Sequence, residues 1–290
     1  MLQIVTDSGA DLAEDQINGL PIHVIQLGLN LEGQVYDKNN PIKSERFYQL
    51  LETSNDYPTT SQVSTGDFVE IYKKIADQGD QILSIHISSG LSGTLNSAKI
   101  AGAMVPEANI TYWDSKTLSA GLGWQVQAAA IAAVNNWSLS AILERLALIR
   151  DQVDGLFTLK ELRYLIHGGR ISHIKGLMAQ VLKIKPIIAV EHVNGTYDNI
   201  AQSITFKRAV QNLVDISFEK FQKERVRVQI VHGNSPDGIA FLKEKIDEKL
   251  DAFYETVVPV APVLGAHTGP SLVGLIIGPM ALFTDLINAT

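Results

Sequence analysis

Short apolar runs alternate with amphipathic stretches over the first half of the chain, and this rhythm constrains the fold more than any other sequence feature. The runs at 2–6, 82–87 and 109–113 are too short for typical helices and end at polar residues, as buried strands do. Apolar residues with helical spacing lie at 67–76 and from Thr94 onward. Strands alternating with helices are typical of a parallel sheet covered by helices on both faces.

Other segments of this half carry weaker signals. We expect one strand at 21–31, a helix at 44–52, a polar loop at Asn55–Gly66, and helices at 125–134 and 140–150. Together with the strands above, these segments predict an α/β domain over residues 1–155.

The second half changes its rhythm. The pattern predicts strands at 156–159, 185–193, 227–232, 255–260 and 272–277, helices at 160–166, 206–223 and 238–250, a hairpin turn at Asn194-Gly195 and a loop at 265–271. The hairpin makes a mixed or antiparallel sheet the best prediction. We therefore expect a two-domain α/β protein, with an α+β domain at 156–290 following the parallel-sheet domain.

Composition excludes several functions. The net charge of −7 and pI near 5.5 argue against nucleic acid as a partner, since surfaces that bind it are basic. The chain has no cysteine, which excludes disulfides, thiolate metal sites and cysteine nucleophiles, and its seven histidines lack metal-ligand spacing. We expect no signal peptide at MLQIVTDSGAD, no membrane span in the mostly apolar stretch 272–283, and a cytosolic location.

The sequence HISSGLSGT at 86–94 places four hydroxyls and two glycines where a strand is expected to become a helix. Such a turn directs backbone N–H groups and the positive end of the helix dipole at one spot, which favours an anion. The alternative is a capping turn in which Ser92 or Thr94 satisfies the first helical amides. A nucleophile elbow would need G-x-S-x-G, and Gly90-Leu91-Ser92-Gly93 is one residue short.

Three further stretches could bind a ligand. The loop Thr59–Gln62 clusters small donors, although such loops are usually plain turns. His267, between glycines in GAHTGP, could donate to an anion or act as a general base, or it could satisfy local backbone groups. Arg170 in GGRIS offers a planar fork for a carboxylate or phosphate, and a solvated arginine is the alternative.

Taken together, these motifs resemble the DegV family over essentially the whole chain. The resemblance rests on TDSGADL at 6–12, TTSQ at 59–62, ISSGLSGT at 87–94, DSK at 114–116, GGRIS at 168–172 and GAHTGP at 265–270. The chain departs from the family pattern at Gly9, Val63 and Ser271, where the family often has Ser or Thr, Pro, and Gly. Of these changes, only Gly9 removes a hydroxyl.

The resemblance implies a protein that holds one long-chain fatty acid, such as palmitate, stearate or oleate, between its two domains. Proteins of this kind are binding subunits of bacterial fatty acid kinase, which present the carboxylate to a separate catalytic subunit that makes acyl-phosphate for phospholipid synthesis. The residues that the resemblance assigns to the carboxylate are Thr60, Ser61, Ser92, Gly93, Thr94, His267 and Thr268. Arg170 is assigned to the head-group end, facing the kinase or the acyl-phosphate.

This interpretation predicts a monomer without cofactor or metal that performs no chemistry alone and contacts membranes only transiently. Two alternatives belong to other classes. A serine hydrolase of acyl esters would use Ser92 and His267 as its catalytic pair. A sensor of sugar or nucleotide phosphates would use the same helix N-terminus. Chain length and unsaturation preference cannot be predicted from the sequence.

Overall fold

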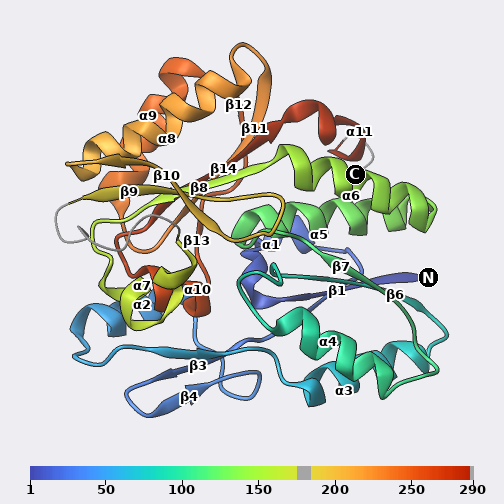
Figure 1. Ribbon diagram of the computed structural model, residues 1–290. Coiled ribbons are helices and arrows are strands. Elements are labelled where there is room, and N and C mark those ends of the chain that lie inside the picture. Colours follow the sequence, from blue (N-terminus) through green and yellow to red (C-terminus); the bar gives the residue numbers. More distant parts are fainter. Residues whose placement is uncertain (175–183, 288–290) are drawn as a thin grey trace.

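The first half of the chain is built around a parallel sheet in the computed structural model, which describes residues 1–174 and 184–287 (Figure 1). Its four strands are, in spatial order, β2 (Ile22–Ile25), β1 (Leu2–Asp7), β6 (Gln81–His86) and β7 (Asn109–Asp114). All neighbouring pairs are parallel. Ile4, Val5, Leu83 and Ile85 are fully buried, which explains why these strands read as apolar runs.

Helices cover both faces of this sheet. The helices that pack around it are α3 (Thr65–Ala76), α4 (Thr94–Ala103), α5 (Ser119–Val134) and α6 (Leu139–Gln152). Figure 1 shows α3 and α4 on one side and α5 and α6 on the other. The predicted parallel-sheet α/β architecture of this half is confirmed.

A small antiparallel sheet corrects two of the predicted segments. It has the strand order β4 (Gln34–Tyr36), β3 (Gly28–Leu31) and β5 (Thr59–Ser61). The expected single strand at 21–31 is wrong, because β2 and β3 belong to different sheets. The expected loop at Asn55–Gly66 is also wrong in part, since Thr59–Ser61 pairs with β3 and α3 begins at Thr65. Nearby lie the 3-10 helix η1 (Ser8–Ala10) and the helices α1 (Glu14–Ile17) and α2 (Ser44–Thr53).

The second half forms a mixed sheet of seven strands. The strand order is β10 (Tyr197–Ser203), β9 (Lys185–Val190), β8 (Asp154–Thr158), β14 (Val273–Pro279), β11 (Arg225–His232) and β12 (Asp251–Tyr254), with β13 (Val258–Pro259) also paired to β11. The β9–β10 hairpin and the pairs around β14 are antiparallel, whereas β11 runs parallel to β12 and β13. The predicted mixed sheet is confirmed, although the expected strand at 255–260 is replaced by β12 and β13. The division of the chain at residue 155 stays a prediction.

The two faces of the second sheet have different neighbours. One face packs on α8 (Phe206–Phe221) and α9 (Pro236–Lys249), where Leu156 and Ile187 belong to their apolar cluster. The other face, with Phe157 and Ile188, belongs to the same apolar cluster as the first sheet. Alternate residues of β8 and β9 therefore face opposite layers, as the pleat requires.

The remaining elements join the two halves. They are α7 (Arg163–His167), η2 (Arg170–His173), α10 (Pro262–Thr268), η3 (Met280–Leu282) and α11 (Thr284–Ile287). At the junction Arg227 of β11 is only 2% exposed and lies 4.5 Å from the ring centroid of Trp124 and 4.4 Å from that of Phe283. Its Nε donates to Glu255 at 2.9 Å. A buried cation thus bridges α5, β11 and η3.

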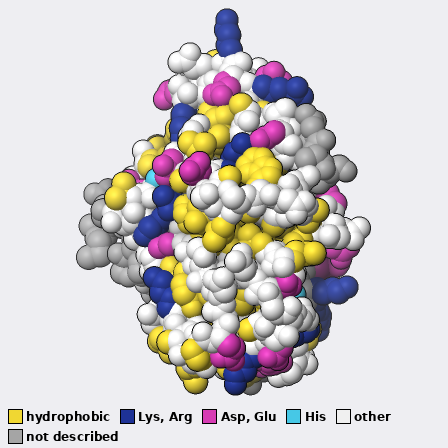
Figure 2. Space-filling model, turned by 90° about the vertical axis from the view of Figure 1, so that its right-hand side faces the viewer, with side chains coloured by type: hydrophobic (Ala, Val, Ile, Leu, Met, Phe, Trp, Pro, Cys, Tyr) yellow, Lys and Arg dark blue, Asp and Glu magenta, His cyan; other side chains and the backbone are white. Residues whose placement is uncertain are grey.

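The surface at the right of Figure 1 carries both signs of charge. In Figure 2 acidic and basic side chains are interspersed around apolar ones that gather across the middle of this face. Mixed charge of this kind is typical of a solvated protein surface. Among the residues that the structure describes, no helix has both the length and the apolar character needed to cross a membrane.

Candidate functional site

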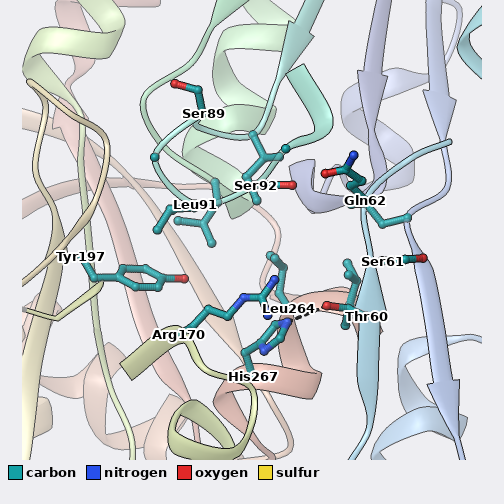
Figure 3. Close-up of a pocket in the computed structure, with 16 residues that line it drawn as sticks. Thr60, Ser61, Gln62, Ser89, Leu91, Ser92, Arg170, Tyr197, Leu264 and His267 are labelled. Carbon is teal, nitrogen blue, oxygen red and sulfur yellow. Dashed lines mark hydrogen bonds between the residues drawn. The ribbon is translucent and has the colours of Figure 1, made fainter. Parts of the chain in front are cut away.

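A cavity of about 440 Å³ lies where residues from both halves of the chain meet, and we call it the polar cavity because of its lining. Six of the eight predicted site residues line it: Thr60, Ser61, Ser92, Gly93, Arg170 and His267. They come from β5, the turn before α4, η2 and α10. Segments more than 200 residues apart therefore meet at one place (Figure 3).

Thr60 and His267 form the direct link across this cavity. The Oγ1 atom of Thr60 lies 2.8 Å from Nε2 of His267, as the dashed line in Figure 3 shows. Thr60 points inward because it is the middle residue of β5, whereas Thr59 on the same strand is exposed. Ser61 turns its hydroxyl away from the cavity, against Gly28 of β3.

His267 stands on a helix, which corrects the loop expected at 265–271. Pro262 occupies the first turn of α10 and Gly269, with φ +73°, follows its end, and both are typical at these positions. Gly265 is packed against Tyr48 rather than opened toward a ligand. The histidine is therefore held by a short rigid element instead of a flexible glycine loop.

The imidazole of His267 is neutral at physiological pH. Burial, and to a smaller extent the positive charge of Arg170, lower the pKa of His267 to about 4. Its Nδ1 is buried and has no hydrogen-bond partner within the described parts of the chain. A Cβ at residue 168 would meet Nδ1, so Gly168 allows the ring to approach, and a proton on Nδ1 would be a buried donor without an acceptor. We therefore assign the ring proton to Nε2, which donates to Thr60 Oγ1.

The turn before α4 is held by hydrogen bonds to Asp7 and within its own backbone. Asp7 at the end of β1 accepts from the Ile87 amide at 3.0 Å and hydrogen-bonds His86 Nδ1 at 2.9 Å. The amides of Leu91 and Ser92 both donate to the Ser88 carbonyl at 3.0 Å. The strand-to-helix turn predicted from the sequence is thus present and fixed.

Ser92 combines both roles that the sequence left open. Its Oγ accepts from the Thr94 amide at 3.2 Å, which is the expected capping contact, and lies 2.9 Å from Thr94 Oγ1. Because Ser92 also lines the polar cavity, its hydroxyl is available there as well. Thr94 itself is fully buried and does not line the cavity.

Gly93 and Gln62 occupy neighbouring positions on the cavity wall. The side-chain amide of Gln62 fills the space that a Cβ at Gly93 would take, and Gln62 Nε2 donates to Ser97 Oγ at 2.9 Å. A Cβ at residue 93 would therefore displace the end of the Gln62 side chain, whereas the φ of −77° places no demand for glycine. Gln62 was missed as a wall residue, although it ends the TTSQ motif.

Arg170 reaches the opposite side of the polar cavity. It follows Gly169, whose φ of +74° turns the chain sharply after α7, and its Nη1 donates to the Gly168 carbonyl at 2.7 Å. This bond fixes the guanidinium near His267 and leaves further donors on its planar fork. Figure 3 shows its head group between His267 and Tyr197.

A second, small cavity of about 40 Å³ lies beside the first, and we call it the apolar cavity. Its walls are mostly apolar: Leu118, Leu156, Phe157, Val190, Tyr197, Val231, Val260, Leu264, Leu272 and Ile276, with Gly155, Thr117, Ser119 and Thr268. Thr268 faces this cavity rather than the polar one, and its hydroxyl donates to the Leu264 carbonyl at 3.1 Å. Apart from Thr268, which was predicted for the carboxylate instead, sequence reasoning missed these residues because each carries only an ordinary core signal.

Neither cavity presents a metal centre. Within residues 1–174 and 184–287 no group of three or more histidine, aspartate or glutamate side chains is arranged to hold an ion. The donors of the polar cavity are hydroxyls, a neutral imidazole and a guanidinium, which suit an anionic oxygen ligand. The arrangement thus offers a polar anion site beside an apolar chamber.

The chain is similar to known proteins over most of its length. A family model described as an uncharacterised protein of the DegV family matches residues 1–279. A DegV domain-containing protein from Staphylococcus aureus is 35% identical over 94% of this chain and 97% of its own length.

Two solved structures share the fold. A DegV family protein from Thermus thermophilus, whose structure is described as showing fatty acid binding, is 28% identical and covers 96% of this chain and 99% of its own, with a TM-score of 0.86. DegV from Bacillus subtilis, described as a fatty acid binding protein, is 26% identical with the same coverage and TM-score. Since the family model and a relative of 35% identity both span nearly the whole chain, this protein belongs to the DegV family.

Proposed function

We propose that this protein binds one long-chain fatty acid, with the carboxylate in the polar cavity and the acyl chain running into the apolar cavity, which widens as the chain enters. The observation that carries the proposal is that the two cavities share part of their walls, so a polar anion site adjoins an apolar chamber. Two structural relatives that are described as fatty acid binding support it.

The Thr60–His267 pair suits a carboxylate. When His267 donates from Nε2 to Thr60 Oγ1, the hydroxyl hydrogen of Thr60 is left to donate to the ligand. The Ser92 hydroxyl lies on the same cavity, and charge-assisted hydrogen bonds of this kind are about twice as strong as neutral ones. A buried carboxylate is tolerable only when its oxygens are satisfied in this way.

The acyl chain would supply most of the affinity. Each buried methylene contributes about 0.8 kcal/mol, so a chain of about sixteen carbons gives an upper bound on the order of 12 kcal/mol before ordering costs. The polar residues then orient the ligand instead of driving its binding. Palmitate, stearate and oleate are the ligands we propose.

We propose further that the loaded protein presents its carboxylate to the catalytic subunit of a fatty acid kinase. Arg170 would serve that encounter, because its remaining guanidinium donors face the polar cavity. The acyl-phosphate would then feed phospholipid synthesis. We propose a cytoplasmic monomer without cofactor that performs no chemistry alone.

The geometry supports a serine hydrolase less well. The Ser92 hydroxyl is bonded to Thr94, and His267 uses Nε2 for Thr60. No described residue accepts from His267 Nδ1, whereas a catalytic base of this class is oriented by an acid there. We expect neither the wild type nor Ser92→Ala to hydrolyse p-nitrophenyl esters. Hydrolysis by the wild type that is lost in Ser92→Ala would favour the hydrolase.

The decisive experiment extracts lipid from protein purified from bacteria and then measures uptake by the delipidated protein. We expect a long-chain acid at one per chain by native mass spectrometry, and saturable uptake of palmitate or oleate. A ligand-free protein that takes up neither acid contradicts the proposal. Thermal stabilisation by sugar or nucleotide phosphates, without stabilisation by fatty acids, would favour the phosphate sensor instead.

The kinase role has its own test. Loaded protein, a bacterial fatty acid kinase catalytic subunit and ATP are mixed, and acyl-phosphate is measured. We expect product only when all three are present, and Arg170→Ala is expected to keep its bound acid while yielding less product. Equal product formation from free palmitate without this protein contradicts the presenting role.

A further inference from the structure

Three side chains belong to the walls of both cavities. Leu118 precedes α5, Tyr197 begins β10 and Leu264 lies on α10, so they arrive from three separate elements. The two cavities adjoin at these side chains, so a ligand that occupies both cavities contacts them. We call these three residues the neck.

Tyr197 is the most constrained member of the neck. It is 5% exposed, and its ring meets that of Phe157 edge to face, with centroids 5.5 Å apart and an angle of 72°. The hairpin turn just before it packs on the segments that follow β6 and β7, because Gly195 lies against Ser88 and the backbone of Lys116. The ring therefore cannot swing aside without displacing Phe157 or lifting the hairpin.

The hydroxyl of Tyr197 marks where the polar cavity begins. Figure 3 shows it pointing toward Arg170, with Leu91 above and Leu264 behind the guanidinium. On the other side Leu264 lies one helical turn before Thr268, which faces the apolar cavity. A ligand held at His267 would thus reach the neck within its first few carbons, since Leu264 and His267 are three residues apart on α10.

The walls beyond the neck are closely packed around a small cavity. Val190, Val231, Val260 and Leu272 are 6%, 4%, 2% and 4% exposed, and all of them belong to packed apolar clusters. Protein interiors of this density respond to one added methyl group with displaced side chains or backbone. Substituents on a chain in this region would therefore meet fixed atoms.

We propose that the neck of Leu118, Tyr197 and Leu264 selects unbranched acyl chains and that Tyr197 is its specificity-determining residue. The inference rests on the proposed function, since it concerns which acids the site takes. A straight chain passes between the three side chains, whereas a methyl branch on the carbons at the neck collides with the Tyr197 ring.

The experiment measures displacement of a fluorescent fatty acid by palmitate and by phytanic acid, which has the same main chain with added methyl branches. We expect the wild type to prefer palmitate by about tenfold or more, the scale of overpacking by one or two methyl groups. Tyr197→Ala should lower this preference by about tenfold, and Leu118→Ala, at a partly buried position, should lower it in the same direction.

Two control variants separate the neck from general effects. Tyr197→Phe keeps the ring and is expected to keep the preference. Val231→Ala enlarges the apolar cavity from β11, which three strands separate from β10 and Tyr197, and is also expected to keep the preference. Tyr197→Ala could fail to fold, and Leu118→Ala then decides the question.

The outcomes distinguish the two proposals. If wild-type protein binds both acids equally, the neck inference is overturned while fatty acid binding stands. If neither Tyr197→Ala nor Leu118→Ala changes the preference, the inference is also overturned. If the wild type binds no acid of any kind, both the inference and the proposed function fail.

Discussion

Replacing Thr60 with valine tests the polar cavity most sharply, because the two side chains have nearly the same shape. The change removes the hydroxyl that lies 2.8 Å from His267 Nε2. It deletes the donor that we propose for the carboxylate and leaves the imidazole N–H unpaired. A hydrogen bond to a charged group contributes about 1.5–3 kcal/mol, so palmitate affinity should fall by about 10- to 100-fold.

Two variants control this experiment. Thr60→Ser retains the hydroxyl and should bind within a few fold of wild type. Thr59→Val makes the same chemical change on the exposed face of β5, outside the polar cavity, and should leave affinity unchanged. Affinities come from displacement of a fluorescent fatty acid, and melting curves check that each variant is folded. Wild-type affinity in Thr60→Val, or an equal loss in Thr59→Val, would refute the reasoning.

The remaining predictions concern stability. His267 has a pKa of about 4 in the folded protein, against 6.5 for the free side chain, so only the unfolded state gains a proton as pH falls through this window. The free energy of unfolding should therefore fall by up to about 3 kcal/mol between pH 6.5 and 4, as measured by urea unfolding. His267→Gln should show a smaller fall. An identical pH profile for the variant and the wild type would contradict the low pKa of His267. Gly93→Ala should destabilise by about 1 kcal/mol, the low end for overpacking, because its Cβ displaces the flexible end of Gln62. Adding Gln62→Ala should restore most of the loss, and no recovery would argue against this contact. Glu255→Leu should lower the free energy of unfolding by about 3–5 kcal/mol, because it leaves the buried Arg227 cation without its carboxylate partner. Adding Arg227→Met should recover this loss. A loss well below this range in Glu255→Leu would show that water reaches the site.

The regular elements of the first half were predictable because their signals are local. The apolar run before His86 and the serine-glycine turn at 87–94 determine a buried strand, a sharp turn and a helix start, and the structure has all three. The helix α9 in the second half was also predictable from a local signal, since Leu242 and Ile246 are buried as the helical spacing predicts.

The polar cavity was harder to predict from the residues alone. Thr59–Ser61 has no apolar periodicity, and it is a strand only because β3 lies beside it. The α10 helix was missed even though Pro262 and Gly269 are recognisable start and stop signals, because the glycines around His267 suggested a loop.

Convergence itself leaves no local trace in the sequence. Thr60 and His267 are 207 residues apart, and only the packing of α10 against β5 brings them together. Tyr197 was missed for the same reason, since its position in β10 gives no sign that it borders two cavities. Only the resemblance to the DegV family indicated that these separate motifs belong to one site.

A crystal structure of the delipidated protein soaked with palmitate tests the central claim most directly. We predict a carboxylate oxygen within about 2.5–3.0 Å of Thr60 Oγ1 and the chain running past Tyr197 into the apolar cavity. A carboxylate bound elsewhere, or an acyl chain lying on the outer surface while the apolar cavity stays collapsed, would contradict the account.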